Sequence, residues 1–201
     1  QEGQKAIYYA CGETVAKLDL LPQTERLQEQ GYEILYLTDD MDEFVLKMMG
    51  TYQEKPFCSV SDADLGLASE AEQEDLQQQT EAHKDLLAFL QENLSGEVKE
   101  VRLSTRLKSH PVCLTTAGEV SLEMEKVLNA MPSEQKVKAE RVLEINANHP
   151  VFQALTEIYP ADLEKAKTYG KILYNQALLI EGLPIADPVA YANEVCSLMA
   201  K

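Results

Sequence analysis

Few side chains in this sequence have the types and spacing that chemistry requires. The acidic run Asp39–Glu43 offers clustered carboxylates, but a calcium-binding loop needs a glycine at its sixth position, where Phe44 stands. We therefore interpret the run as the cap and acidic first turn of a helix, where carboxylates interact favourably with the helix dipole. We predict no metal site in this chain.

His110 and Cys113 are the nearest candidates for a thiol–imidazole pair. They are three residues apart, so on a strand they would point to opposite faces, and we expect Cys113 to be a small core residue. His149 precedes Pro150 at a predicted helix start, which favours capping or packing, and His83 is expected to be exposed. The sequence contains no HExxH motif, phosphate-binding glycine loop, GxSxG motif or dinucleotide fingerprint. We therefore predict no catalytic residue and no cofactor here, and expect that the chain is not an enzyme.

Composition excludes several other classes of function. The 201 residues carry a net charge of -16, with 45% hydrophobic residues, as in an ordinary globular protein. A chain this acidic lacks the basic surface that nucleic acids and anionic lipids require, and no apolar run reaches the roughly 20 residues that span a bilayer. Scattered cysteines without a CxxC pair favour free thiols in a reducing, cytoplasmic location: Cys11, Cys58, Cys113 and Cys196.

The start of the chain and its charge distribution indicate more than one unit. Gln1 is followed within a few residues by an apolar strand, whereas natural chain starts usually carry disposable residues before the first core element. We therefore expect a piece of a longer protein. Residues 1–95 hold 6 basic and 20 acidic side chains, and residues 96–201 hold 12 and 14. This asymmetry is typical of two distinct units.

Strands and helices alternate in the first 68 residues. This order predicts a small α/β/α unit with a parallel sheet covered by helices. The expected elements are a strand at 6–10, a helix at 13–30 ended by Gly31, a strand at 33–37, a helix at 41–49 and a strand at 57–60.

A long, acidic connecting helix is predicted at 70–94, before an α+β domain. In residues 101–108, apolar residues alternate with Arg102, Ser104, Arg106 and Lys108, which is the pattern of a half-buried strand. The remaining expected elements are strands at 112–116 and 142–147 and helices at 116–131, 150–155, 162–181 and 187–200.

The helix expected at 116–131 carries one apolar stripe. A capping box, Thr116–Glu119, would start it, and Pro132 would stop it. The stripe consists of Val120, Met124, Val127, Leu128 and Met131. Two interpretations remain open: the stripe packs on the sheet, or it is offered to partners, a role that suits methionine because its side chain fits many surfaces.

The last two helices are more apolar than two helices can bury alone. The helix from Asp162 has a seam of Leu173, Ala177 and Ile180, but Leu179 lies off that seam. Two alternatives remain open. The pair packs against its own sheet, or it packs against the same pair of a second chain as a four-helix bundle.

Several motifs, in order along the whole chain, resemble the ninety-kilodalton heat-shock chaperones, in their bacterial form. Residues 2–9 (EGQKAIYY) and 55–60 (KPFCSV) resemble the end of the middle domain of that family. The C-terminal domain is matched by residues 101–107 (VRLSTRL), Leu143–Asn146 with His149 and Pro150, and residues 175–179 (NQALL).

The resemblance implies an ATP-driven homodimeric chaperone with its ATP and Mg site upstream of this chain. It implies middle-domain residues at 1–68, a connecting helix at 69–95 and a dimerisation domain at 96–201. The client-binding residues would be Val120, Met124, Val127, Leu128 and Met131, with Phe44 and Met48 as a second patch for which core packing is the alternative. The dimer contact would use Leu173, Ala177, Leu179, Ile180, Val189, Ala192, Val195 and Met199.

We therefore expect a chaperone fragment that holds two protomers together and offers apolar surface to unfolded client proteins. The fold is expected to be α+β overall, with partners restricted to a second copy and client proteins, and with neither nucleic acid nor membrane. The alternative function is a stand-alone dimeric adaptor.

Overall fold

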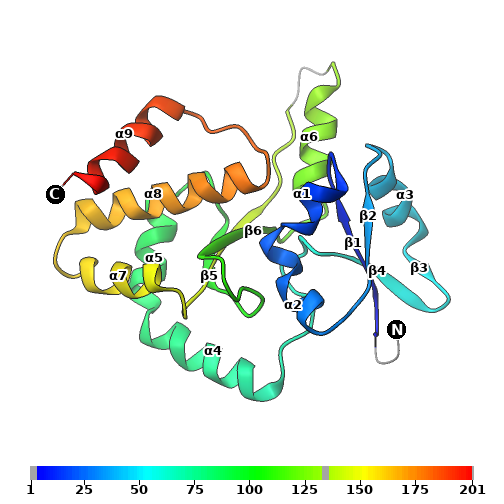
Figure 1. The fold of residues 1–201 in the computed structure, drawn as a ribbon, viewed down its shortest axis with the longest axis horizontal. Coiled ribbons are helices and arrows are strands. Elements are labelled where there is room, and N and C mark those ends of the chain that lie inside the picture. Colours follow the sequence, from blue (N-terminus) through cyan, green and yellow to red (C-terminus); the bar gives the residue numbers. More distant parts are fainter. Residues whose placement is uncertain (1–3, 133–135, 201) are drawn as a thin grey trace. The chain divides into compact units, whose positions relative to one another are not determined.

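The computed structural model describes residues 4–132 and 136–200 and divides them between two compact units (Figure 1). The first unit combines residues 1–67 with 115–141, and the second combines 68–114 with 142–201. Gln1–Gly3, where the family resemblance begins, and Lys201 lie outside the described residues. Each unit is therefore built from two separate segments, whereas the expected domains are continuous stretches of chain.

The first unit contains the parallel sheet that its element order predicts. The strands are β1 (Ile7–Cys11), β2 (Ile34–Leu37), β3 (Thr51–Tyr52) and β4 (Lys55–Ser59), in the order β2-β1-β4-β3. β1 is parallel to both neighbours, and Tyr8 lies opposite Ile34 on one side and Cys58 on the other. The short β3 is antiparallel to β4 and was not predicted, because its turn uses Gln53 and Glu54 at positive φ instead of the usual Asn-Gly.

The continuous helix expected at 13–30 is wrong. The segment instead forms α1 (Val15–Asp19), a 3-10 turn η1 (Pro22–Thr24) and α2 (Glu25–Glu29). Pro22 lacks the amide hydrogen that a helix interior needs, and it occupies the first position of the 3-10 turn. Gly31, at a φ of 68°, follows α2 and supplies the left-handed conformation in which helices commonly end. α3 (Asp42–Met49) matches its expected position to one residue at the start.

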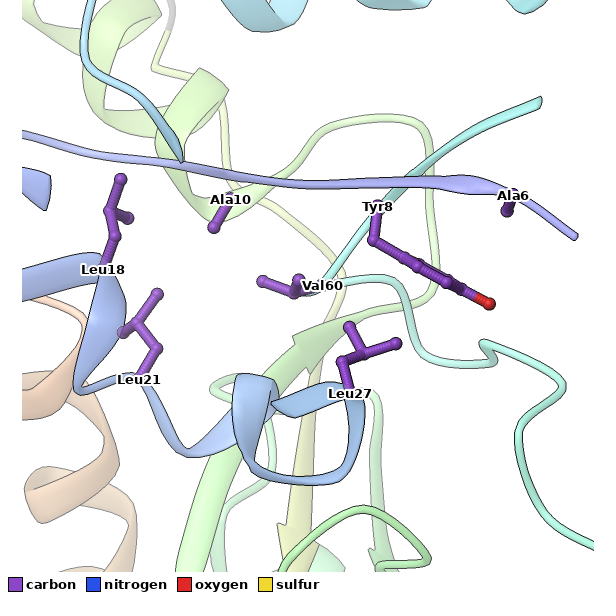
Figure 2. Packing of buried hydrophobic residues seen from close by; sticks show 7 residues of the cluster. All are labelled: Ala6, Tyr8, Ala10, Leu18, Leu21, Leu27 and Val60. Atoms are coloured by element: carbon purple, nitrogen blue, oxygen red, sulfur yellow. The ribbon is translucent and has the colours of Figure 1, made fainter. Parts of the chain in front are cut away.

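Apolar side chains from the strand and from the broken helical segment form the core of the first unit (Figure 2). Ala6, Tyr8 and Ala10 alternate along one face of β1, as the period of a strand requires. Leu18, Leu21 and Leu27 converge on them from the helical segment, with Val60 between the two sets. The ring of Tyr8 also stacks on that of Tyr32.

The second unit contains a three-stranded sheet covered by helices. Its strands are β5 (Glu100–Leu103), β6 (Val112–Thr116) and β7 (Arg141–Ile145), in the order β5-β7-β6. β5 is parallel to β7, with Val101 opposite Leu143. β5 ends five residues earlier than expected. The last two residues of β6 and the first of β7 belong to the first unit.

The helices of the second unit are α4 (Glu70–Ala82), α5 (Lys84–Asn93), α7 (Pro150–Ile158), α8 (Leu163–Ile180) and α9 (Pro188–Met199). The single helix expected at 70–94 is divided at His83, whose φ of -117° and ψ of 17° lie outside the helical range. His83 is half-buried, not exposed as expected, and its ring meets Phe152 edge-on. The expected caps Asp162 and Asp187 each accept a hydrogen bond from a backbone amide of the following turn.

Candidate protein-binding surfaces

α6 (Leu122–Ala130) carries the predicted apolar stripe, but it begins later than expected. Thr116 lies in β6, so the predicted capping box at Thr116–Glu119 does not form. Ser121 is the actual N-cap, and its hydroxyl oxygen accepts a hydrogen bond from the amide of Met124 at 3.1 Å. Val120 therefore precedes the helix, and Met131 is its C-terminal capping residue.

The stripe is only partly exposed. Val127 is buried at 8% exposure, whereas Met131 is 46% exposed. Val120, Met124 and Leu128 are half-buried. The structure thus places the five predicted residues along one segment of the first unit, and Met131 is the exposed member of the five.

Polar contacts hold α6 to the chain segment that follows it. The buried Glu125 carboxylate accepts a hydrogen bond from the amide of Ala139 at 2.8 Å and pairs with the guanidinium of Arg141. The Asn129 side chain bonds both the carbonyl and the amide of Val137, at 2.7 and 2.8 Å. These contacts fix the middle and the end of the helix within the first unit.

A buried carboxyl on α3 holds the other end of α6. Glu43, at 3% exposure, accepts hydrogen bonds from the hydroxyl of Ser121 and from that of Tyr9, the latter at 3.3 Å. One turn further along α3, the Lys47 ammonium donates to the carbonyl of Glu119. Burial raises the pKa of Glu43, although Ser121, Lys47 and Tyr9 each act to lower it. The sequence interpretation of Asp39–Glu43 as a cap and acidic first turn did not identify this residue, because its partners Ser121 and Tyr9 are 78 and 34 residues away.

The opposite face of α3 is exposed and apolar. Met48 is 88% exposed, and it shares this face with Met41, Val45 and Met49, which follow the helical spacing. Of the two residues predicted for a second patch, Phe44 is half-buried and Met48 is exposed.

The acidic run before α3 caps its start in a way that differs from the prediction. Met41 is the N-cap residue, and Asp39 accepts a hydrogen bond from its amide at 3.0 Å. Asp42 and Glu43 lie in the first turn, as expected. Across residues 4–132 and 136–200, no group of three metal-ligating side chains is placed to hold an ion.

The C-terminal helices present the second exposed apolar surface. On α8, Leu173 and Ala177 are buried inside the unit, whereas Leu179 and Ile180 are exposed. α9 lies beside α8, yet none of its residues from Pro188 to Met199 is buried, and Met199 is 76% exposed (Figure 1). Of the other predicted residues, Val189 and Ala192 are exposed and Val195 is half-buried.

A buried ion cluster lies in the sheet of the second unit. The carboxylate of Glu144, at 1% exposure, accepts hydrogen bonds from Arg102 at 2.7 Å and Arg106 at 3.1 Å, and from the Ser104 hydroxyl at 2.7 Å. Burial alone would raise the pKa of Glu144, but the guanidiniums of Arg106 and Arg102 outweigh it and lower the pKa. The expectation that Arg106 lies on a solvated strand face is wrong, since that side chain is buried beyond the end of β5.

The predicted roles of two other residues are confirmed. Cys113 is fully buried, and burial raises the pKa of its thiol well above the ordinary value, which makes it an inert core residue. His149 caps α7, because its ring nitrogen Nδ1 accepts a hydrogen bond from the amide of Val151 at 3.2 Å.

Among the helices in the described part of the chain, none combines the length and apolar character that crossing a bilayer demands.

Exposed apolar helix faces in an α+β framework are typical of proteins that bind other proteins. Comparison with known proteins specifies the class: residues 1–201 match the family model described as Hsp90 protein. The chain therefore belongs to the Hsp90 family of chaperones, as its motifs indicated.

The chain is also similar to chaperone proteins of several bacteria. It is 56% identical over 199 residues to the chaperone protein HtpG of Clostridium acetobutylicum, covering 99% of this chain and 32% of that protein. Identity to HtpG of Halalkalibacterium halodurans is 56% over 200 residues, covering 100% and 32%, and to HtpG of Bacillus subtilis 54% over 198 residues, covering 98% and 32%. The chain thus spans about a third of the length of the curated relatives that it matches.

Proposed function

We propose that this chain joins two chaperone protomers and presents apolar surface to non-native proteins. The observation that carries the proposal is that each unit has a helix with an uncovered apolar face, α3 in the first unit and α9 in the second. Membership in the Hsp90 family supports a chaperone role for these faces.

The client-binding surface in this proposal lies in the first unit. It comprises the exposed methionine face of α3 and the accessible end of the α6 stripe, at Met131. Methionine side chains are flexible and polarisable, so they can pack against many different apolar segments. The first unit is also rich in carboxylates, which favours client segments whose apolar stretches are flanked by basic residues.

The dimer contact in this proposal lies in the second unit. α9 has no buried residue, so its apolar side chains need a cover, and a second copy of α8 and α9 would supply one as a four-helix bundle. The exposed residues available for it are Leu179, Ile180, Val189, Ala192, Leu198 and Met199. Because Leu173 and Ala177 are already buried, they support these residues from beneath.

We propose that this chain does not hydrolyse ATP by itself. We assign ATP and Mg to other parts of the longer chaperone. The pure 201-residue chain should show no ATP turnover of its own.

Client binding can be tested apart from dimerisation. Met48→Glu combined with Met131→Glu should weaken binding of a permanently unfolded probe, reduced and carboxymethylated α-lactalbumin, by about tenfold, because it places charges in the apolar contact. Fluorescence anisotropy measures the affinity, and light scattering should show an unchanged mass.

The matched control is Leu20→Glu, which alters an exposed leucine of the same unit, at 75% exposure, that belongs to neither α3 nor α6. It should bind the probe normally. Equal affinities for the double variant and the unaltered chain would remove the first unit from client binding.

A further inference from the structure

Two hydrogen bonds join α3 to the segment that starts α6. Glu43 and Lys47 are four residues apart, so they lie on one face of α3, and they bond Ser121 and the Glu119 carbonyl respectively. The exposed methionine face of α3 is on the other side of the helix. One face of α3 therefore contacts the segment that starts α6, and the opposite face is exposed to solvent.

The contact at Ser121 is shared by three elements. Its hydroxyl donates to Glu43 and accepts from the Met124 amide, so it caps α6 and binds α3 with the same oxygen. The other oxygen of Glu43 accepts from Tyr9 on β1. The start of α6 is therefore connected to the central strand of the sheet through one carboxyl group.

Within the part of the chain that the structure describes, the hydrogen-bond donors to that carboxyl are the hydroxyls of Ser121 and Tyr9. A hydrogen bond to a buried charged group is stronger than a neutral one, but leaving such a group without its partners is costly. Burial raises the pKa of Glu43, because it disfavours the charged form of the carboxyl group. Such a contact is easier to break than a buried ion pair.

We propose that Glu43 is a positioning residue that keeps α6 seated on α3, and that breaking its contact with Ser121 releases the start of the helix. In the seated position Val127 is buried and Met124 and Leu128 are half-buried. Release therefore uncovers apolar surface. The consequence for client binding, but not the seating itself, rests on the function proposed above.

Amide hydrogen exchange of the full 201-residue chain tests the seating without any client. Glu43→Met keeps the size of the side chain but loses both hydrogen bonds, and it should make amides of residues 119–128 exchange about tenfold faster. Glu43→Gln keeps an oxygen that accepts from Ser121, and should exchange like the unaltered chain. The matched control is Glu123→Met, which removes an acid of α6 that pairs only within its own helix, with Lys126.

Equal exchange in Glu43→Met and the unaltered chain would show that packing alone seats the helix, and would overturn the proposal. So would an equal loss of protection in Glu43→Gln and Glu43→Met.

If Glu43→Met unfolds the whole unit, two further variants test the same contact through charge repulsion. Ser121→Asp keeps a good N-cap for α6 but places a second carboxylate against Glu43, so residues 119–128 should exchange faster. Adding Glu43→Gln removes the repulsion and should restore protection. Failure of this rescue would contradict the proposal.

The effect on clients is a separate readout. The released helix of Glu43→Met should bind carboxymethylated α-lactalbumin about threefold more tightly than the seated one. Faster exchange with no probe binding by any variant would leave the seating in place and contradict the proposed function. Normal probe binding with unchanged exchange would contradict the seating and leave the proposed function in place.

Discussion

Glu43 is buried in the first unit and Glu144 in the second, and these two glutamates are held in different ways. Glu144 in the second unit is bound by two guanidiniums and a hydroxyl, and its pKa is lowered. Glu43 in the first unit is bound by two hydroxyls, and its pKa is raised. Both side chains are almost completely buried, so the difference comes from their partners and not from their depth.

The difference shows what each contact is suited to. A buried carboxylate with two arginines cannot lose its partners without leaving uncompensated charge, which fixes β5, β7 and the loop after β5 together. A buried carboxyl among hydroxyls has weaker partners and can exchange between bound and free states at lower cost. The contact at Glu144 is therefore the stronger of the two, and it resembles the buried Glu125–Arg141 pair of the first unit more than the contact at Glu43.

The largest expected effect comes from making the same substitution in both places. Glu144→Gln should destabilise the second unit by about 3–5 kcal/mol, because it removes the buried charge that pairs with Arg106 and Arg102. Glu43→Gln should change the stability of the first unit by less than about 1 kcal/mol, because an amide satisfies most of the same hydrogen bonds. Hydrogen exchange in β7 and β1 reports the two units separately.

Similar costs at the two positions would contradict the comparison. Unchanged hydrogen-exchange protection of β7 in Glu144→Gln would also contradict the comparison.

Smaller, pH-dependent effects should have opposite signs in the two units. The pKa of Glu144 lies below its ordinary value of 4.5, so its ionised form stabilises the fold above that pH, and this contribution is lost as the pH falls through the folded-state pKa. The pKa of Glu43 lies above 4.5, so its contribution is full below that pH and is lost as the pH rises through the folded-state pKa. Lys47 and Asp62 also act on Glu43, in opposite directions.

The unaltered chain should therefore gain stability relative to Glu43→Gln as the pH falls from neutral toward 4.5. Its advantage over Glu144→Gln should stay constant over that range and shrink only at lower pH. Urea titrations at several pH values measure both differences in stability. Amide hydrogen exchange, corrected for its intrinsic pH dependence, reports the protection of each unit at the same pH values. A parallel pH dependence of the two differences would count against the assigned partners.

Elements with strong local signals could be predicted from the sequence. The bounds of β6 match residue for residue, because a run of apolar and β-branched residues is closed by turn residues on both sides. α8 and α9 match within one residue at each end, since Asp162, Asp187 and Pro188 start them and Gly182 follows the first.

Features that depend on distant partners could not be predicted in this way. Arg106 alternates with apolar residues like a solvated side chain, and only Glu144, 38 residues later, explains its burial. Glu43 could be assigned only to an acidic first turn of a helix, since its partner Ser121 is 78 residues away. The start of α6 was misplaced for a local reason: Thr116–Glu119 and Ser121 are competing N-cap signals, and pairing of Thr116 in β6 decides between them.

The central claim is that the two units have separate binding roles, and photo-crosslinking tests it most directly. A diazirine amino acid is placed at Met48 of the first unit or at Met199 of the second, positions with 88% and 76% exposure. In the presence of carboxymethylated α-lactalbumin, the probe at Met48 should crosslink to that unfolded protein, and the probe at Met199 should crosslink to a second copy of the chain. Crosslinks to the unfolded protein from Met199 and to a second copy from Met48, or the same product from both, would contradict the account.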